Sequence, residues 1–207
     1  MGYAELLRQA QDLGFTQPDN RDKFLDVIIE KSELLSRIID DLLDISKIEN
    51  GYCLELQKKP TTIRKTLSKV VEHFERQAKQ HVFSLTTDAN VPETVVIDEG
   101  RIVQVLENLL SNAVKYSPGG GFVELRAETK PDKLHISVID RGIGMSECQL
   151  ERIFDKFYRA NVNNPAFQGL GLGMSIVKEI IETHGGEIKV ESALGEGTLV
   201  HFTLPCS

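Results

Sequence analysis

The chain has 207 residues, a net charge of −7 and an apolar content of 41%, a composition typical of a globular domain with one smaller element. No apolar run reaches the roughly 18 residues that a membrane-spanning helix needs, so we expect no membrane segment in this chain. The acidic balance leaves no basic stripe that could displace counterions, which excludes nucleic-acid binding. Three cysteines, far apart and without metal-ligand spacing, fit a reducing compartment.

The first fifty residues have the pattern of a helical hairpin, and they carry six basic and eleven acidic residues. We predict a short helix at 2–13, a turn at 14–20, and a long helix at 21–49 that ends at Asn50-Gly51. Apolar residues on the long helix recur at steps of three and four, which is bundle spacing: Leu35, Ile38, Leu42 and Ile45. Further apolar positions widen this stripe, so we predict a homodimer in which two hairpins form a four-helix bundle. The alternative is a hairpin that packs only on its own domain.

From residue 52 onward the pattern is mixed. We predict helices at 62–78, 99–116 and 172–185, short helical pieces and a polar loop at 146–171, and seven strands: 52–57, 82–87, 94–97, 122–129, 133–140, 187–192 and 198–205. The strands come in hairpins rather than in βαβ alternation. This favours an α+β class, with one mixed sheet that carries helices on one face, a two-layer α/β sandwich.

The stretch ENLLSNAVKYS at 107–117 places two asparagines and a lysine on one side of a helix, opposite an apolar stripe. An ordinary solvated face would favour Glu, Lys and Arg instead. An amide oxygen of Asn108 or Asn112 suits Mg²⁺, Lys115 can bind a phosphate, and Tyr116 can pack against a ring. The set therefore predicts a Mg²⁺–nucleotide site, provided that another segment covers it.

A second motif, IDRGIGM at 139–145, ends an apolar strand with Asp140. A carboxylate at the end of a buried strand is costly unless it has a partner or a function. Asp140 could accept a hydrogen bond from the amino group of adenine, which guanine's carbonyl cannot donate. Gly142 and Gly144 would allow close approach of backbone and ligand. A plain turn at a strand end explains the same residues equally well.

A third motif, GLGLGM at 169–174, precedes and opens a helix, whose backbone N–H groups favour phosphate. It matches neither the P-loop nor the dinucleotide fingerprint, and a flexible hinge is the alternative. Between the second and third motifs, IFDKFYRANVNNPAFQ at 153–168 has aromatic anchors and a polar remainder, as a lid requires. Finally, GEGT at 195–198 places Thr198 directly after a tight turn, which the turn alone would explain.

In this order and spacing, the motifs resemble the nucleotide-binding boxes of the sensor histidine kinases of two-component signalling. ENLLSNAVKYS resembles their N box, DRGIGM and GLGLGM their two glycine boxes, IFDKFYR their F box, and GEGT their last glycine motif. Residues 1–51 resemble their dimerization and histidine-phosphotransfer domain, and residues 52–207 their ATP-binding catalytic domain. The resemblance implies a Bergerat-type sandwich that binds ATP and Mg²⁺, a response regulator receiver domain as partner, and a cytoplasmic location, with a membrane anchor on the parent protein left open.

The resemblance also implies residue roles. Asn112 would ligate Mg²⁺ with support from Glu107 and Asn108, Lys115 would contact phosphate, and Tyr116 would lie against the adenine–ribose side. Asp140 would bind the adenine amine with Thr198 acting through water, while Gly142 and Gly144 flank the base. Arg159 would approach the γ-phosphate from the lid, and the last group would wrap the phosphates: Gly169, Gly171, Leu172 and Gly173. Asn112, Lys115 and Arg159 would be the catalytic residues.

One departure from the family pattern concerns the phosphate acceptor. The family places its accepting histidine on the first bundle helix, and residues 1–50 contain no histidine; the five present are His73, His81, His135, His184 and His201, for which we predict structural or solvent roles. The predicted hairpin arms also differ in length, roughly 18 Å against 43 Å. We therefore expect a fragment that begins just after the acceptor, binds Mg-ATP, and does not autophosphorylate.

Three alternative functions stay open. The ATPases of gyrase, chaperone and mismatch-repair proteins have a glutamate four residues before the Mg²⁺ asparagine, where this chain has Asn108, which cannot act as a base. A serine kinase shares the nucleotide boxes, although the acidic hairpin argues against it. A scaffold that dimerises but has lost nucleotide binding is the third.

Overall fold

The computed structural model describes residues 18–52, 54–131, 133–159 and 170–206, and the chain divides into two compact units, 1–46 and 47–207. Helix α2 (Pro18–Glu49) confirms the predicted long helix. The predicted turn at 14–20 is wrong from residue 18 onward, because the helix already begins at Pro18. Proline suits a first helical position, where its missing N–H removes no helical hydrogen bond. Residues 14–17 and the predicted helix at 2–13 lie outside the described residues.

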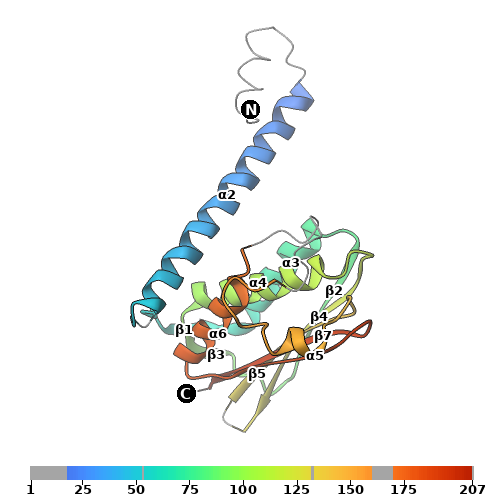
Figure 1. Ribbon diagram of the computed structural model, residues 1–207. Coiled ribbons are helices and arrows are strands. Elements are labelled where there is room, and N and C mark those ends of the chain that lie inside the picture. Colours follow the sequence, from blue (N-terminus) through green and yellow to red (C-terminus); the bar gives the residue numbers. More distant parts are fainter. Residues whose placement is uncertain (1–17, 53, 132, 160–169, 207) are drawn as a thin grey trace. The chain divides into compact units, whose positions relative to one another are not determined.

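The second unit is built on a five-stranded mixed sheet with the order β2-β4-β5-β7-β6. Its strands are β2 (His81–Thr87), β4 (Gly121–Lys130), β5 (Lys133–Asp140), β6 (Ile188–Ala193) and β7 (Gly197–Pro205). Strands β2 and β4 are parallel, whereas the other neighbours are antiparallel. The hairpins β4–β5 and β6–β7 were both predicted from the alternation of apolar residues (Figure 1).

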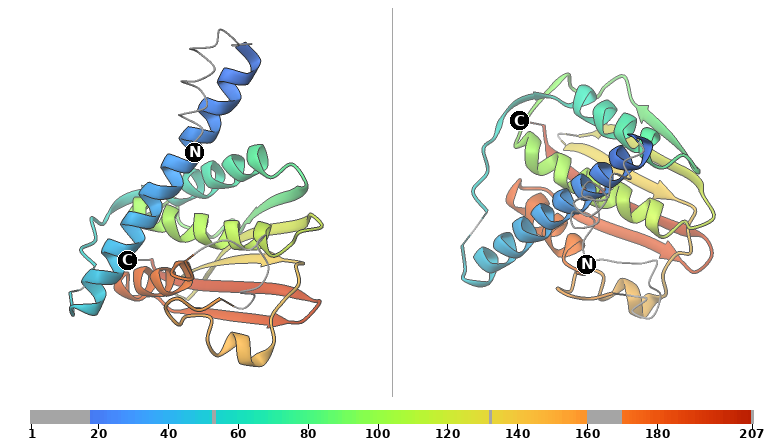
Figure 2. Two further views of the ribbon diagram at one scale, coloured as in Figure 1. Left: turned by 45° about the horizontal axis from the view of Figure 1, so that its top comes forward. Right: turned by 90° about the horizontal axis from the view of Figure 1, so that it is seen from above.

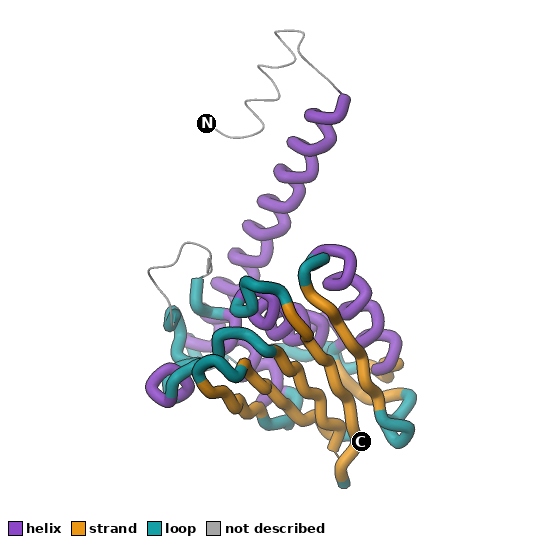
Figure 3. Tube along the Cα trace, turned by 90° about the vertical axis from the view of Figure 1, so that its right-hand side faces the viewer, coloured by secondary structure: helices purple, strands orange, loops and turns teal. Residues whose placement is uncertain are grey.

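Three helices cover one face of this sheet: α3 (Ile63–Gln77), α4 (Glu99–Lys115) and α6 (Gly173–Thr183) (Figure 2). Each turns an apolar stripe toward the sheet, as their 3.6-residue periodicity predicted. The α4 stripe is fully buried: Ile102, Val105, Leu106, Leu109, Leu110 and Ala113. Figure 3 shows the opposite face of the sheet without a helix over it. The α+β class with helices on one face is therefore confirmed.

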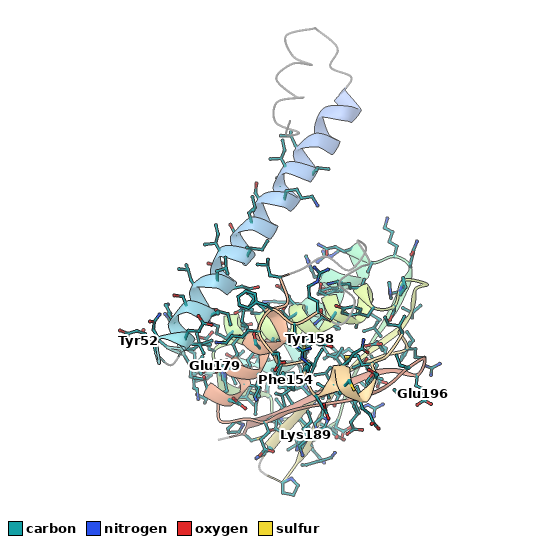
Figure 4. All side chains as sticks on the ribbon, in the orientation of Figure 1. Tyr52, Phe154, Tyr158, Glu179, Lys189 and Glu196 are labelled. Carbon is teal, nitrogen blue, oxygen red and sulfur yellow. The ribbon has the colours of Figure 1, made fainter. Side chains whose placement is uncertain are left out.

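A second, two-stranded sheet was not predicted as a separate element. It pairs β1 (Lys59–Thr62) with β3 (Thr94–Ile97) in antiparallel register. The predicted strand at 52–57 is wrong: its described residues form no ladder, and the strand starts later, at Lys59. The alternation there arises from an extended segment in which Leu54 is buried and Tyr52 points outward (Figure 4).

The end of this extended segment bonds to the termini of two helices instead of to a strand. Gln57 donates its backbone N–H to Asp98, the N-cap of α4, and Lys58 reaches the His184 carbonyl at the end of α6. Asp98 in turn donates its backbone N–H to Nε2 of His184 at 3.1 Å. Buried His184 therefore ties the caps of α4 and α6 together, a structural role that confirms the prediction for this histidine.

No helix in the described part of the chain is long and apolar enough to cross a bilayer.

Candidate functional site

One end of the candidate site is a row of polar side chains on three neighbouring strands. Strand β5 ends at Asp140, which pairs with Thr198 on β7, and Thr198 pairs with Ser192 on β6. Because cross-strand partners project to the same side of a sheet, all three lie on the helix-covered face. Asp140 is only 9% exposed, although it is charged in its ordinary state. The row thus brings a carboxylate and two hydroxyls to one place.

The surroundings of Asp140 act on its charge in two opposing ways. Burial raises the pKa of this carboxyl above its usual range, while the backbone N–H groups of Gly142 and Thr198 partly offset the rise. The Gly142 N–H lies 2.8 Å from Oδ1. Burial is the larger effect, so the carboxylate is destabilised in the folded chain and would gain from a further hydrogen-bond donor.

Two glycines hold this end of the site together, as the sequence predicted from their need for close approach. A side chain at Gly142 would begin 2.4 Å from the Tyr116 carbonyl oxygen and 2.9 Å from Oδ1 of Asp140. Gly144 has a φ of +63°, and a side chain there would begin 1.9 Å from the Ala193 carbonyl oxygen. The end of α4, the turn after β5 and the β6–β7 hairpin therefore meet at these two residues.

Helix α4 supplies the second part of the site. Glu107, Asn108, Asn112 and Lys115 are half-buried, whereas the apolar stripe of the same helix is fully buried. Asn108 lies against the start of α6, since a side chain at Gly173 would begin 2.6 Å from its Oδ1. Within the described residues, no group of three or more His, Cys, Asp or Glu could hold a metal ion. The oxygen atoms that α4 could offer to a metal here belong to the amides of Asn108 and Asn112 and to the carboxylate of Glu107.

Cationic groups converge at the C-terminal end of α4. Burial lowers the pKa of Lys115, and the positive charge of Arg159 lowers it further. Burial also raises the pKa of Tyr116, which Arg159 partly counteracts, so Arg159 is close to both residues. The Lys115 Nζ lies 5.1 Å from the centre of the Tyr116 ring. Lys115 and Arg159 thus bring two positively charged side chains to one place, which favours the binding of an anion.

Arg159 reaches this place from the segment after α5 (Glu147–Leu150). Phe157 has a φ of +62°, which is an uncommon backbone conformation for a bulky residue. Its side chain is 60% exposed. A side chain at Gly171 would begin 2.6 Å from the Tyr158 carbonyl oxygen, so the start of the GLGLG motif packs on the F-box segment. The Nζ of Lys178 on α6 lies over the Phe154 ring, 5.5 Å from its centre.

The segment between Arg159 and Leu170 includes Gly169, which lies outside the described residues. Leu172 is 1% exposed, so its side chain belongs to the core and only its backbone is available at the start of α6. Its carbonyl accepts the first helical hydrogen bond, from Ile176. Of the described residues predicted from sequence, Gly142 thus lies beside Asp140 and the Tyr116 carbonyl, and Gly173 lies beside Asn108.

Two polar residues of this place were not predicted. Ser192 accepts from the Met145 N–H and contacts Thr198. Ser117 buries its hydroxyl oxygen beside Gly142, where the described residues give it no hydrogen-bond partner. Symmetry about the GEG turn could have identified Ser192, because a hairpin turn fixes which residues pair across it. No comparable sequence signal marks Ser117.

Comparison with known proteins agrees with this geometry. The model of the histidine kinase-, DNA gyrase B- and HSP90-like ATPases matches residues 97–207, and the histidine kinase A phospho-acceptor domain matches residues 1–51. The sensor histidine kinase WalK of Bacillus subtilis is 37% identical over 196 residues, which cover 90% of this chain. The chain spans 31% of that relative's length.

Solved structures show the same similarity. A structure described as full-length ShkA in complex with AMPPNP aligns over 91% of this chain and 39% of its own, with a TM-score of 0.72 and 28% identity. The histidine kinase ThkA in complex with the response regulator TrrA aligns over 99% of this chain and 57% of its own, with a TM-score of 0.66 and 26% identity. The chain therefore belongs to the sensor histidine kinases of two-component systems.

Proposed function

We propose that this chain is the ATP-dependent catalytic region of a protein-histidine kinase, which binds Mg-ATP and transfers the γ-phosphoryl group to a histidine. The observation that carries the proposal is that a cationic group and a buried carboxylate come together at Gly142. Because Gly142 has no side chain, the Tyr116 end of α4, near Lys115 and Arg159, lies beside Asp140, whose carboxylate accepts hydrogen bonds. An adenine with a triphosphate has a donor amine at one end and anionic oxygens at the other, which matches these two ends.

The base end would be recognised by Asp140. Its carboxylate is destabilised by burial, so the amine of adenine would supply the missing donor, with Thr198 beside it. Tyr116 would lie along the base and ribose, and Gly142 and Gly144 would admit the ring close to the backbone. Guanine would present a carbonyl to a carboxylate and would be rejected.

The phosphate end would be held by charge and by backbone. Lys115 and Arg159 would contact phosphate oxygens, and the γ-phosphate would lie near Arg159. The backbone of Gly169, Gly171, Leu172 and Gly173 would wrap the phosphates at the start of α6. Phosphoryl transfer depends on positioning and charge neutralisation, so Asn112, Lys115 and Arg159 would act without a covalent intermediate.

Magnesium would be held by the Asn112 amide oxygen, with Glu107 and Asn108 in support. The donor set fits, because half-buried amide and carboxylate oxygens on one helix are ligands for a hard cation that keeps water and phosphate oxygens. When bound, Mg²⁺ would neutralise the charge of the phosphates.

We propose that the chain has two functional parts. Residues 1–51 would form a phosphotransfer hairpin that dimerises, and residues 52–207 would form the nucleotide-binding domain. The phospho-acceptor match at 1–51 supports this, and so does the compact unit that begins at residue 47. Residues 1–51 contain no histidine, so we propose transfer to a histidine outside this chain and onward to a response regulator. The complex of ThkA with the response regulator TrrA supports that partner class.

Phosphate transfer in trans tests the proposal. The purified chain is incubated with radiolabelled Mg-ATP and a separate helical bundle that carries a family-type histidine. We expect acid-labile, base-stable phosphate on the bundle but not on the chain, and none on either protein with Asn112→Ala. Acid-labile phosphate on the chain itself, or a bundle that stays unlabelled although ATP is bound, would refute the proposal.

A further inference from the structure

Ser192 lies at a junction of three hydrogen bonds beside the residues that would bind the base. Its hydroxyl oxygen is 2.6 Å from the Gly197 carbonyl oxygen, 2.9 Å from the Met145 backbone nitrogen and 3.1 Å from the Thr198 hydroxyl oxygen. Ser192 thereby connects the turn after β5 to the first residues of β7.

The chemistry of these groups fixes which atom donates in each bond. A carbonyl oxygen carries no hydrogen, so at 2.6 Å the single hydroxyl hydrogen of Ser192 must point to Gly197. The Met145 N–H can only donate, and it donates to the Ser192 oxygen. With its own hydrogen used, Ser192 can bond Thr198 only by accepting, so Thr198 is the donor in the third bond.

The Thr198 hydroxyl has no hydrogen left to donate to a ligand. Its only hydrogen is directed at Ser192, so its oxygen can only accept a hydrogen bond from a further group. Asp140 lies next to Thr198 across the β5–β7 ladder, and an ionised carboxylate likewise only accepts. The Asp140–Thr198 pair on the β5–β7 ladder therefore presents two acceptors side by side.

We propose that Ser192 is a positioning residue that fixes the Thr198 hydroxyl as an acceptor and thereby makes the site select a purine whose exocyclic group at C6 is a donor, a 6-amino-purine over a 6-oxo-purine. This inference rests on the proposed function, because it assumes that the purine edge meets Asp140 and Thr198. Without Ser192, the Thr198 hydroxyl could turn and donate to a carbonyl, so an oxo-purine would be tolerated better.

Calorimetry with ATP and with inosine triphosphate, which has an oxygen in place of the amine, tests this role. We expect the dissociation constant of inosine triphosphate divided by that of ATP to fall about fivefold in Ser192→Ala. This change is the equivalent of one ordinary hydrogen bond. In a Thr198→Val background the same Ser192→Ala change should leave the ratio unaltered, because no hydroxyl remains to be oriented.

Ser137→Ala is the matched control. It removes the same hydroxyl from β5, but three residues before Asp140 and therefore on the opposite face of the sheet, so the ratio should not change. If Ser192→Ala weakens both nucleotides equally or only lowers Tm, Ser192 is merely structural and the inference is overturned. A wild-type chain that binds neither nucleotide would instead overturn the proposed function, so the two failures are distinguishable.

Discussion

Asp140 is a carboxylate at a position where folding alone would favour a neutral residue. Burial raises its pKa, and the two backbone N–H groups that bond it do not fully compensate. Residues that destabilise a fold and persist are commonly functional, because a ligand supplies the interaction that is missing. The strand ending at Asp140 was apparent in the sequence, whereas the degree of its burial depends on β7 and α4 and could only come from the structure.

The substitution Asp140→Asn tests this balance. A group whose pKa is raised on folding destabilises the fold above that pKa, so the neutral amide should increase Tm at pH 7.5. The amide can no longer offer two acceptor oxygens to the amine, so ATP binding should weaken by at least about a hundredfold. Thermal unfolding and calorimetry on the same sample measure both effects, and a loss of stability with unchanged affinity would contradict this role.

The pH dependence of binding follows from the same shift. Protonated Asp140 cannot accept from a donor on both oxygens, and its raised pKa means that protonation begins at a higher pH than for an ordinary aspartate. ATP affinity should therefore fall as the pH drops toward the acidic range, and Asp140→Asn should remove this part of the dependence. A pH profile that is the same in the two proteins would contradict the assignment.

At the scale of secondary-structure elements, the contact between α4 and α6 sets the site. Gly173 leaves room for Asn108, and an added methyl group would begin 2.6 Å from the Asn108 Oδ1. That atom ends a flexible side chain, so Gly173→Ala should displace Asn108 without unfolding the chain. We expect ATP affinity to fall about tenfold, the equivalent of about 1.4 kcal/mol, while Tm is unchanged or higher.

Gly100→Ala provides the control in the first turn of α4. The nearest atom to an added methyl group there is Oδ1 of Asp98 at 3.5 Å, an ordinary contact. This variant should gain stability of up to about 1 kcal/mol without any effect on ATP. If both variants bind ATP like the wild type, the Asn108–Gly173 contact has no part in binding.

His184 makes the caps of α4 and α6 sensitive to pH. Its Nε2 accepts from the Asp98 N–H, so the ring hydrogen is on Nδ1, which donates to the Ile180 carbonyl at 2.8 Å. Burial lowers its pKa, helped by Lys58, while the bond to Ile180 and the charge of Asp98 oppose the shift. The neutral ring is thus favoured in the fold, so its contribution is complete above about pH 6.5 and is lost as the pH falls through the lowered pKa.

His184→Phe removes both bonds and should cost about 1–3 kcal/mol at pH 7.5, measured by urea unfolding. The difference from the wild type should shrink at pH 5.5, where the wild-type ring is driven toward its charged form. His73→Gln, on the exposed side of α3, should leave both values unchanged. An equal loss at both pH values would show that the ring acts by packing alone.

Element boundaries also show what a sequence can and cannot predict here. Alternation and helical periodicity predicted both hairpins and the three helices, because these patterns reflect burial on one face. The strand expected at 52–57 failed because alternation marks any extended chain with one buried side. Its backbone bonds to the side chain of Asp98, a distant partner that no local pattern reveals.

At the scale of the whole molecule, α2 carries large apolar side chains that are exposed among the described residues. Several are more than half exposed: Ile29, Leu35, Ile39 and Leu43. A stripe of this kind on a single helix favours a second copy as partner, which is the dimer that the heptad-like spacing predicted.

Sedimentation equilibrium at micromolar concentration should give twice the chain mass. Leu35→Asp would place a charge in the apolar stripe and should give a monomer, whereas Ser36→Asp adds the same charge at the adjacent exposed position and should leave the dimer intact. A monomeric wild type would contradict the dimer, and a hairpin that packs only on its own domain would then be the better account.

The measurement that bears most directly on the account is calorimetry of ATP binding, with and without Mg²⁺, on the wild type and on Asn112→Ala. We predict measurable binding by the wild type that is stronger with Mg²⁺, and loss of this metal-dependent gain in the variant, whose fold should be intact because Asn112 lies outside the buried stripe of α4. A folded wild-type chain that shows no affinity for ATP in the presence of Mg²⁺ would contradict it.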